Sequence, residues 1–184
     1  RRNRLFLRNP GLTGGAEMND YPPGNLAGFR SPDVIARFAS ASYALVTTSG
    51  VFTTTNVAAS PSITWNRLGT AASTPAGACA VKAADDGGTP VFYLQSGGCR
   101  PRTADGLFRK DGTGSAGAWQ QVATPGGTGG FGVFDVDPND PDRILASHLR
   151  PGQDPRMILS TDGGQTWTNL TALDDLMRGG GAFR

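Results

Sequence analysis

The sequence predicts an all-β protein built from a repeated unit, and three observations support this fold class. Glycine and proline account for 27 and 13 of the 184 residues, so turns between short strands are frequent. No window keeps a helical period of apolar residues, so almost no helix is expected. Trp65, Trp119 and Trp167 each stand three positions before an aliphatic residue. A rare residue that recurs in this way indicates one structural unit used three times.

The first 32 residues do not follow the repeated pattern. Residues 4–8 read Arg-Leu-Phe-Leu-Arg, a short apolar run between two arginines that is compatible with a strand of a preceding unit. The rest of this stretch is expected to be a long loop. We therefore interpret residues 1–32 as an N-terminal arm and loop, a kind of segment that often carries function.

In each of the three following units, the pattern of apolar runs predicts four short strands, separated by turns of Gly, Pro, Asp and Asn. An antiparallel meander of this kind has the size of one propeller blade. Alignment of the third strands places Thr55 and Asp111 at the position of Asp162. We expect the units to cover residues 33–68, 78–122 and 131–170, with residues 180–184 as the first strand of a further unit.

The third unit contains the most specific motif of the chain. Residues 160–167 read Ser-Thr-Asp-Gly-Gly-Gln-Thr-Trp and match Ser-x-Asp-x-Gly-x-Thr-Trp, the Asp-box of the BNR repeat. From residue 33 onward the chain resembles the Asp-box β-propellers, which include sialidases, xyloglucan-type hydrolases, the sortilin ectodomain and photosystem assembly factors. This resemblance implies four-stranded antiparallel blades, of which the chain supplies about three in an incomplete ring. The remaining blades would come from the same longer polypeptide or from another chain.

The box residues are expected to serve folding. A tight turn between the third and fourth strands favours glycine at Gly164, where φ is positive. Asp162 can accept hydrogen bonds from turn amides, beside Ser160. Trp167 can cover the turn with a large apolar surface. The resemblance places this turn away from the central cleft, and Trp65 and Trp119 occupy the same slot in the other units.

Catalytic candidates are few. The Phe-Arg-Ser-Pro stretch around Arg30 is similar to the Phe/Tyr-Arg-Ile-Pro element of sialidases, in which the arginine binds the substrate carboxylate. Asp33 and Asp137 lie at the ends of expected first strands and could supply the carboxylates of a glycoside hydrolase. A turn explains these acids equally well. His148, the single histidine, is expected to be a hydrogen-bonded strand residue.

The composition limits the kinds of binding partner that the sequence predicts. A net charge of +2 does not indicate nucleic acid, no apolar stretch predicts a membrane span, and no metal or cofactor motif is expected. Cys79 and Cys99 fall within one unit, where a disulfide is one of two open alternatives. The resemblance suggests an extracellular or periplasmic protein.

Two functions of different class fit these observations. The first is a non-catalytic propeller segment that binds a protein or glycan partner through its central face. The second is part of a secreted glycoside hydrolase of the sialidase or xyloglucanase type, completed by other blades. The first is favoured because each acid has a turn explanation.

Overall fold

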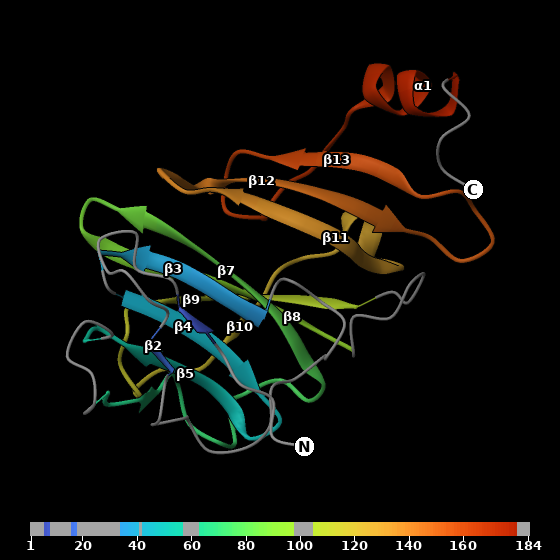
Figure 1. Cartoon of the computed structure of the whole chain (residues 1–184). Coiled ribbons are helices and arrows are strands. Elements are labelled where there is room, and N and C mark those ends of the chain that lie inside the picture. The colour runs from blue at the N-terminus through green and yellow to red at the C-terminus, as the bar shows by residue number, and fades with distance from the viewer. Residues whose placement is uncertain are drawn as a thin grey trace.

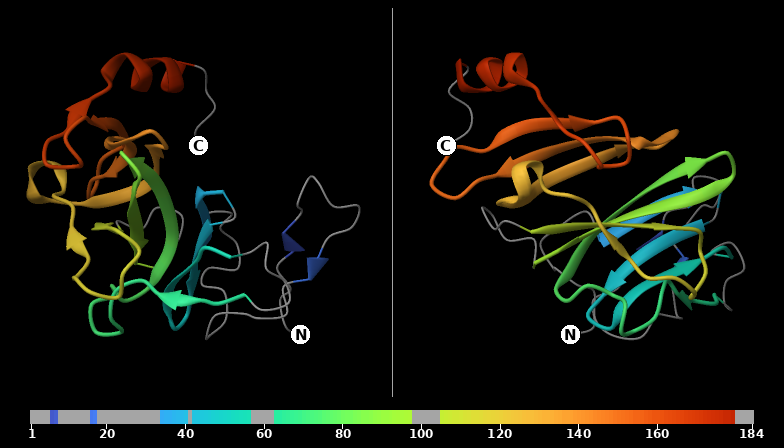
Figure 2. Two further views of the ribbon diagram at one scale, coloured as in Figure 1. Left: turned by 90° about the vertical axis from the view of Figure 1, so that its left-hand side faces the viewer. Right: turned by 180° about the vertical axis from the view of Figure 1, so that it is seen from behind.

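The protein is mostly β-structure, with three four-stranded antiparallel sheets. The computed structural model describes residues 6–7, 16–17, 34–40, 42–56, 63–97 and 105–179. The three sheets follow one another along the chain and lie face to face (Figures 1 and 2). The strands within the described residues do not close into a ring.

Each sheet is a simple meander in which strands adjacent in the sequence are also adjacent in the sheet. A separate pair joins β1 (Phe6–Leu7) to β2 (Ala16–Glu17). The first sheet contains β3 (Ile35–Ala39), β4 (Ser42–Thr47), β5 (Gly50–Thr54) and β6 (Asn66–Arg67). The second contains β7 (Ala78–Asp86), β8 (Thr89–Ser96), β9 (Gly106–Asp111) and β10 (Gln120–Gln121). The third contains β11 (Gly130–Asp137), β12 (Asp140–Leu149), β13 (Arg156–Ser160) and β14 (Thr168–Asn169).

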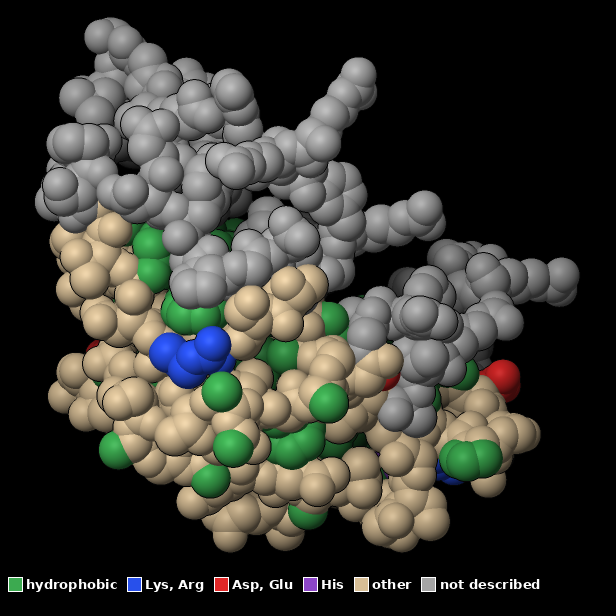
Figure 3. Space-filling model, turned by 90° about the horizontal axis from the view of Figure 1, so that it is seen from below, with side chains coloured by type: hydrophobic (Ala, Val, Ile, Leu, Met, Phe, Trp, Pro, Cys, Tyr) green, Lys and Arg blue, Asp and Glu red, His purple; other side chains and the backbone are tan. Residues whose placement is uncertain are grey.

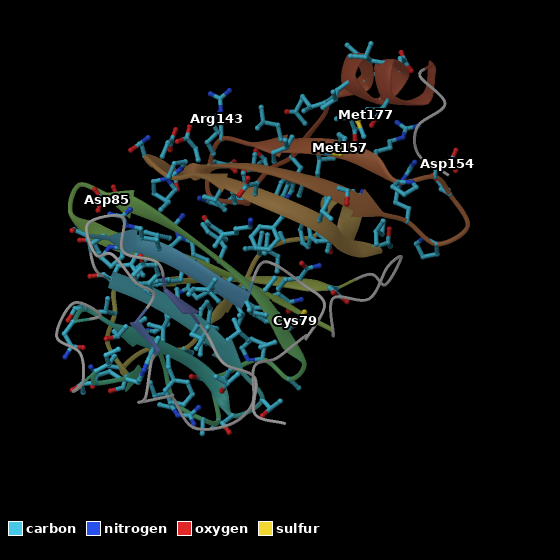
Figure 4. The ribbon with its side chains drawn as sticks, in the orientation of Figure 1. Cys79, Asp85, Arg143, Asp154, Met157 and Met177 are labelled. Atoms are coloured by element: carbon cyan, nitrogen blue, oxygen red, sulfur yellow. The ribbon has the colours of Figure 1, made fainter. Side chains whose placement is uncertain are left out.

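The meander order gives every sheet two functionally different ends. At one end, called here the box end, lie the turns between the first and second strands and between the third and fourth. At the other end, the connection end, lie the turns between the second and third strands and the segments that lead to the next sheet. Figure 4 shows the two ends through two labelled residues of β7, with Asp85 at the box end and Cys79 at the connection end.

The second sheet lies between the other two and contributes to two apolar cores. Because side chains alternate along a strand, Phe92 and Leu94 of β8 face the first sheet, whereas Val91 and Tyr93 face the third. Each core also includes a tryptophan contact. Trp119 belongs to the core between the first and second sheets, and Trp167 packs against the core between the second and third. These cores explain why the sheets stack instead of exposing their apolar faces.

One short α-helix lies within the described residues, which agrees with the expectation of almost no helix. After β14 the chain forms α1 (Thr171–Gly179), and the amide of Asp174 donates to the carbonyl of Leu170 at 3.0 Å. A three-residue helical turn, η3 (Pro125–Gly127), lies between the second and third sheets. Residues 172–177 are mainly good helix formers. The run is too short to give a sustained period, which is why the pattern did not predict it.

The strand pairing also corrects the expected alignment of the units by one residue. The residues that follow the tryptophans pair with Thr53, Arg109 and Leu159 in the third strands. Counting onward from these positions puts Asn56 and Gly112, instead of Thr55 and Asp111, at the position of Asp162. Loops of different length between the third and fourth strands had concealed this register.

Candidate functional site

The turn at the box end of the third sheet is held by a closed set of hydrogen bonds. Ser160 Oγ donates to Asp162 Oδ1 at 2.8 Å and accepts from the amide of Gly164 at 2.8 Å. The Asp162 carboxylate also accepts from the amide and the hydroxyl of Thr166, at 2.9 and 2.5 Å. Gly163 and Gly164 have φ of 71° and 89°, values that favour glycine. The residues of the predicted Asp-box therefore interact with one another.

These bonds also set the charge state of Asp162. The hydroxyl of Thr166, its amide and the hydroxyl of Ser160 stabilise the carboxylate and lower its pKa from 3.8 to about 2. The aspartate is therefore ionised across the physiological range. Its oxygens are engaged within the turn, which indicates a structural use.

The first sheet repeats this turn with different side chains. Thr54 Oγ1 donates to Asn56 Oδ1 at 2.8 Å, as Ser160 does to Asp162. Asn56 Oδ1 then accepts from the amide of Thr64 at 3.1 Å, just before Trp65. The amide oxygen of asparagine thus replaces the carboxylate. Sequence reasoning missed Asn56, although its Thr-x-Asn spacing equals the Ser-x-Asp spacing of the box.

The second sheet forms the corresponding turn in a third way. Lys110, at the position of Ser160, is buried, and its ammonium donates to the carbonyl oxygens of Ala116 and Gly117 at 2.5 and 3.5 Å. Because Gly112 offers no side-chain acceptor, the lysine satisfies loop carbonyls instead of loop amides. This turn therefore occupies the same position in its sheet as the turn at residues 160–166, but different hydrogen bonds hold it.

The tryptophans that follow two of these turns lie at the boundaries between sheets. Trp119 is 7% exposed and shares a core with Leu68, at the start of the segment that leaves the first sheet. Trp167 donates its indole N–H to the carbonyl of Ala123 at 2.9 Å and packs on Phe131, with 5.3 Å between ring centroids. Each of these tryptophans therefore contacts the segment that leaves the preceding sheet. Trp65 is half-buried.

A charged cluster joins the second and third sheets at the box end. Arg109 donates to Asp142 Oδ1 at 2.8 Å, to Asp111 Oδ1 at 3.0 Å and to the hydroxyl of Tyr93 at 3.2 Å. Tyr93 in turn donates to the carbonyl of Pro141 at 2.9 Å, and its burial raises the pKa of its hydroxyl to about 12. Tyr93 is therefore neutral at physiological pH and acts as a fixed donor between the sheets.

Buried polar side chains gather at the connection end of the second and third sheets. Gln95 Nε2 donates to Asp105 Oδ2 at 3.1 Å and to the carbonyl of Gly132 at 2.5 Å. The backbone of Asp105 exchanges two hydrogen bonds with Phe131, at 3.0 and 2.8 Å. His148, which pairs with Phe131, is hydrogen-bonded through Nε2 to the carbonyl of Thr128 at 2.9 Å. The expectation of a hydrogen-bonded strand histidine is confirmed.

Gln95 and Asp105 were not singled out from the sequence. Both are buried, at 6% and 2% exposure, and a buried carboxylate is uncommon in a protein of this size. Their contact depends on the pairing of β8 with β9. No local motif signals it.

A cleft of about 430 Å³ lies at the same end, between the first and second sheets. Its walls are the turn at residues 47–50, Ala71 and residues 74–79. Figure 3 views the molecule from below, the side on which these segments lie, and the described surface there carries few charged side chains. The Sγ of Cys79, in the wall of the cleft, is disulfide-bonded.

The catalytic candidates are not brought together by the described structure. Arg30 and Asp33 lie outside the described residues, as does Cys99, so the pairing of Cys99 with Cys79 stays a prediction. Asp137 lies at the box end, where its Oδ1 accepts from the amide of Asn139 at 3.0 Å. Asp137 therefore has the turn role that the sequence also allows for this acid.

The described residues hold no group of three or more His, Cys, Asp or Glu side chains placed to bind a metal ion. Among the same residues, no helix is long and apolar enough to cross a membrane. No model of a known protein family matches the chain, and no curated protein matches it.

Proposed function

We propose that the three sheets are Asp-box blades of a β-propeller. The observation that carries this proposal is the repetition of one turn network in the first and third sheets. It joins Thr54, Asn56 and Thr64 in one case and Ser160, Asp162 and Thr166 in the other. The four-stranded meanders and the tryptophans at the sheet boundaries support the same interpretation. Further blades, from the same polypeptide or another chain, would be its structural partners.

The biochemical role of the protein, in this proposal, is to bind a protein or glycan partner through its central face, without catalysis. The connection end supports this role because it holds the cleft, whose wall includes the exposed turn residues Thr48 and Ser49. The amide of Ser49 donates to Thr47 Oγ1 at 3.1 Å, and a concave site with polar groups fixed in this way can present a preorganised surface to a ligand. Asp137 lies at the opposite end, within a turn, and gives no support to hydrolysis.

An oxidising compartment, extracellular or periplasmic, fits the disulfide-bonded state of Cys79. Disulfides persist in such compartments and are rare in the cytosol. The runner-up function, a glycoside hydrolase of the sialidase or xyloglucanase type, would act in the same compartments. An activity measurement distinguishes the two.

A glycan array probed with the fluorescently labelled chain, run in parallel with hydrolysis assays on sialosides and xyloglucan oligosaccharides, tests the proposal. We expect retention of a glycan with no release of sugar. Ser49→Trp, which places a bulky side chain in the wall of the cleft, is expected to weaken retention about tenfold or more. Asn139→Trp, the matched control in an exposed turn at the box end, is expected to leave retention unchanged.

Two results would contradict the proposal. Release of sugar by the wild-type chain would favour the hydrolase. Equal retention by the Ser49 and Asn139 variants, with unchanged circular dichroism, would remove the connection end as the binding face.

A further inference from the structure

One face of the third sheet carries apolar side chains at positions that the other two sheets bury. Strand pairing puts Leu145 at the position of Ala44 in the first sheet and Tyr93 in the second. Ala44 and Tyr93 are both 0% exposed, because the next sheet covers them, whereas Leu145 is 37% exposed. Figure 4 shows Arg143, which precedes Leu145 by two residues on the same face, pointing away from the second sheet.

Leu170 extends this face in the same register. The amides of Leu68, Val122 and Leu170 each donate at 2.9 Å to a carbonyl of the third strand of their own sheet, which shows that the three residues occupy one position. Leu68 and Val122 are buried, at 0% and 6% exposure, in cores that hold Trp119 and Trp167 of the following sheet. Leu170 is only half-buried.

The two existing interfaces also show which feature an incoming sheet needs. Gly164, in the box turn of the third sheet, lies so close to Val122 that an added Cβ would be 2.3 Å from its Cγ1. At the preceding boundary, Gly114 occupies the corresponding turn and accepts from the amide of Gly69 at 3.2 Å. Both turns therefore contact the end of the preceding sheet, and a tryptophan follows each of them. Only Gly164 leaves no room for a side chain, since a Cβ on Gly114 would meet only the amide nitrogen of Ala116 at 3.8 Å.

The opposite side of the stack is different. Leu45 and Phe52 of the first sheet, whose side chains alternate with those that face the second sheet, are 0% and 4% exposed. Among the described residues, the partly exposed apolar sheet face is therefore the one at Leu145. α1 is anchored at the edge of β13, where Asp174 Oδ1 accepts from the amide of Met157 at 2.8 Å.

We infer that the face formed by Leu145, Leu159 and Leu170 binds a further four-stranded sheet of the same repeat, with the turn between its third and fourth strands and an aromatic residue placed on Leu170. The inference rests on the proposed blade repeat and identifies the surface through which the next blade attaches. Its basis is continuity: two interfaces of one design already exist in the chain, and this face offers the same positions a third time.

A thiol reporter in an extended chain tests the inference. Residues 130–170 are repeated after residue 179 of the full chain, so that α1 becomes the connecting segment. Leu145→Cys is introduced in the original sheet alone, with and without the extension, and its reaction with a maleimide is timed. The added thiol is expected to react several-fold more slowly in the extended chain, because the second copy covers it. The unreduced wild-type chain gives the background.

Two variants complete the experiment. Gln165→Cys, in the exposed box turn, is the matched control and is expected to react at the same rate in both chains. Leu170→Asp in the original sheet is expected to restore rapid reaction at position 145. Equal rates at position 145 with and without the extension would overturn the inference. Because no ligand is used, this result is independent of glycan binding, and either proposal can fail alone.

Discussion

At the residue scale, the same turn is held by side chains of different chemistry in the three sheets. Asp162 offers a carboxylate, Asn56 an amide oxygen, and Lys110 reaches across the turn with an ammonium in place of the Ser160 hydroxyl. In the first two cases an oxygen accepts from a backbone amide that follows it in the loop. In the first and third sheets the turn therefore uses a short side-chain acceptor, and a negative charge is one way to supply it.

Asp162 provides a test of this point through pH. Its pKa in the folded chain, about 2, lies below the ordinary aspartate value of 3.8. A carboxyl with a depressed folded pKa adds stability that is complete above the unfolded pKa and is lost as the pH falls through the folded one. The urea midpoint of the wild-type chain should therefore fall between pH 4 and pH 2 in part because of this group.

Asp162→Asn is the matched variant, because asparagine already serves at position 56. It should show a flatter pH dependence over the same window and keep most of the stability at neutral pH. Asp162→Ala, which removes the acceptor, should be less stable than the asparagine variant at every pH. Identical pH profiles for wild type and Asp162→Asn would contradict the assignment.

At the element scale, the segments that follow the fourth strands do more than lead the chain to the next sheet. They also pack against the tryptophan of that next sheet. Trp167 of the third sheet contacts Val122 and Ala123, in the segment that follows the second sheet. Trp119 of the second sheet packs with Leu68, in the segment that follows the first sheet. The tryptophan of one unit is thus packed by the end of the unit before it. A strand-turn-strand element of this kind is stable only beside its neighbour.

Trp167→Phe isolates the polar part of this contact. Phenylalanine keeps a ring near Phe131 but cannot donate to the carbonyl of Ala123. The expected loss is about 1 kcal/mol in the free energy of unfolding, the usual net value of one hydrogen bond. Urea denaturation followed by circular dichroism measures it. Trp167→Ala, which also removes the packing, should lose at least twice as much; equal losses would show that the ring contributes little.

At the scale of the whole molecule, the two ends of the sheet stack differ in how they are held. The box end has an ionic and hydrogen-bonded cluster around Arg109 and the short turns. The connection end has the disulfide-bonded Cys79 and the buried side chains of Gln95 and Asp105. The cleft thus lies at the end that contains the disulfide-bonded cysteine, and the ionic cluster lies at the opposite end.

The predicted Cys79–Cys99 bridge can be tested directly. It would close a loop of about twenty residues, and its reduction is expected to lower the free energy of unfolding by about 2–4 kcal/mol. Maleimide labelling of the denatured, unreduced chain should detect no free thiol, and mass spectrometry should find the linked peptides. A free thiol, or a disulfide-linked dimer on a non-reducing gel, would rule out the intrachain pair.

The sequence predicts the all-β class and the repeated unit because the tryptophans and turn residues are local signals that alternate with short apolar runs. It does not predict the register at Asn56, because loops of different length separate that residue from Trp65. It also does not predict the cluster of Gln95, Asp105 and His148, which depends on strands paired across the connection end. Arg30 and Asp33 remain sequence predictions.

The alternation along β8 has a further consequence for how the chain unfolds. Phe92 and Leu94 belong to one core while Val91 and Tyr93 belong to the other, so a single strand couples both. Loosening the middle sheet would remove one wall from each neighbour, and nearest-neighbour coupling of this kind makes separate melting of the sheets costly. The three meanders should consequently unfold together in one concerted transition, because the coupling lies between the repeats and not within any one of them.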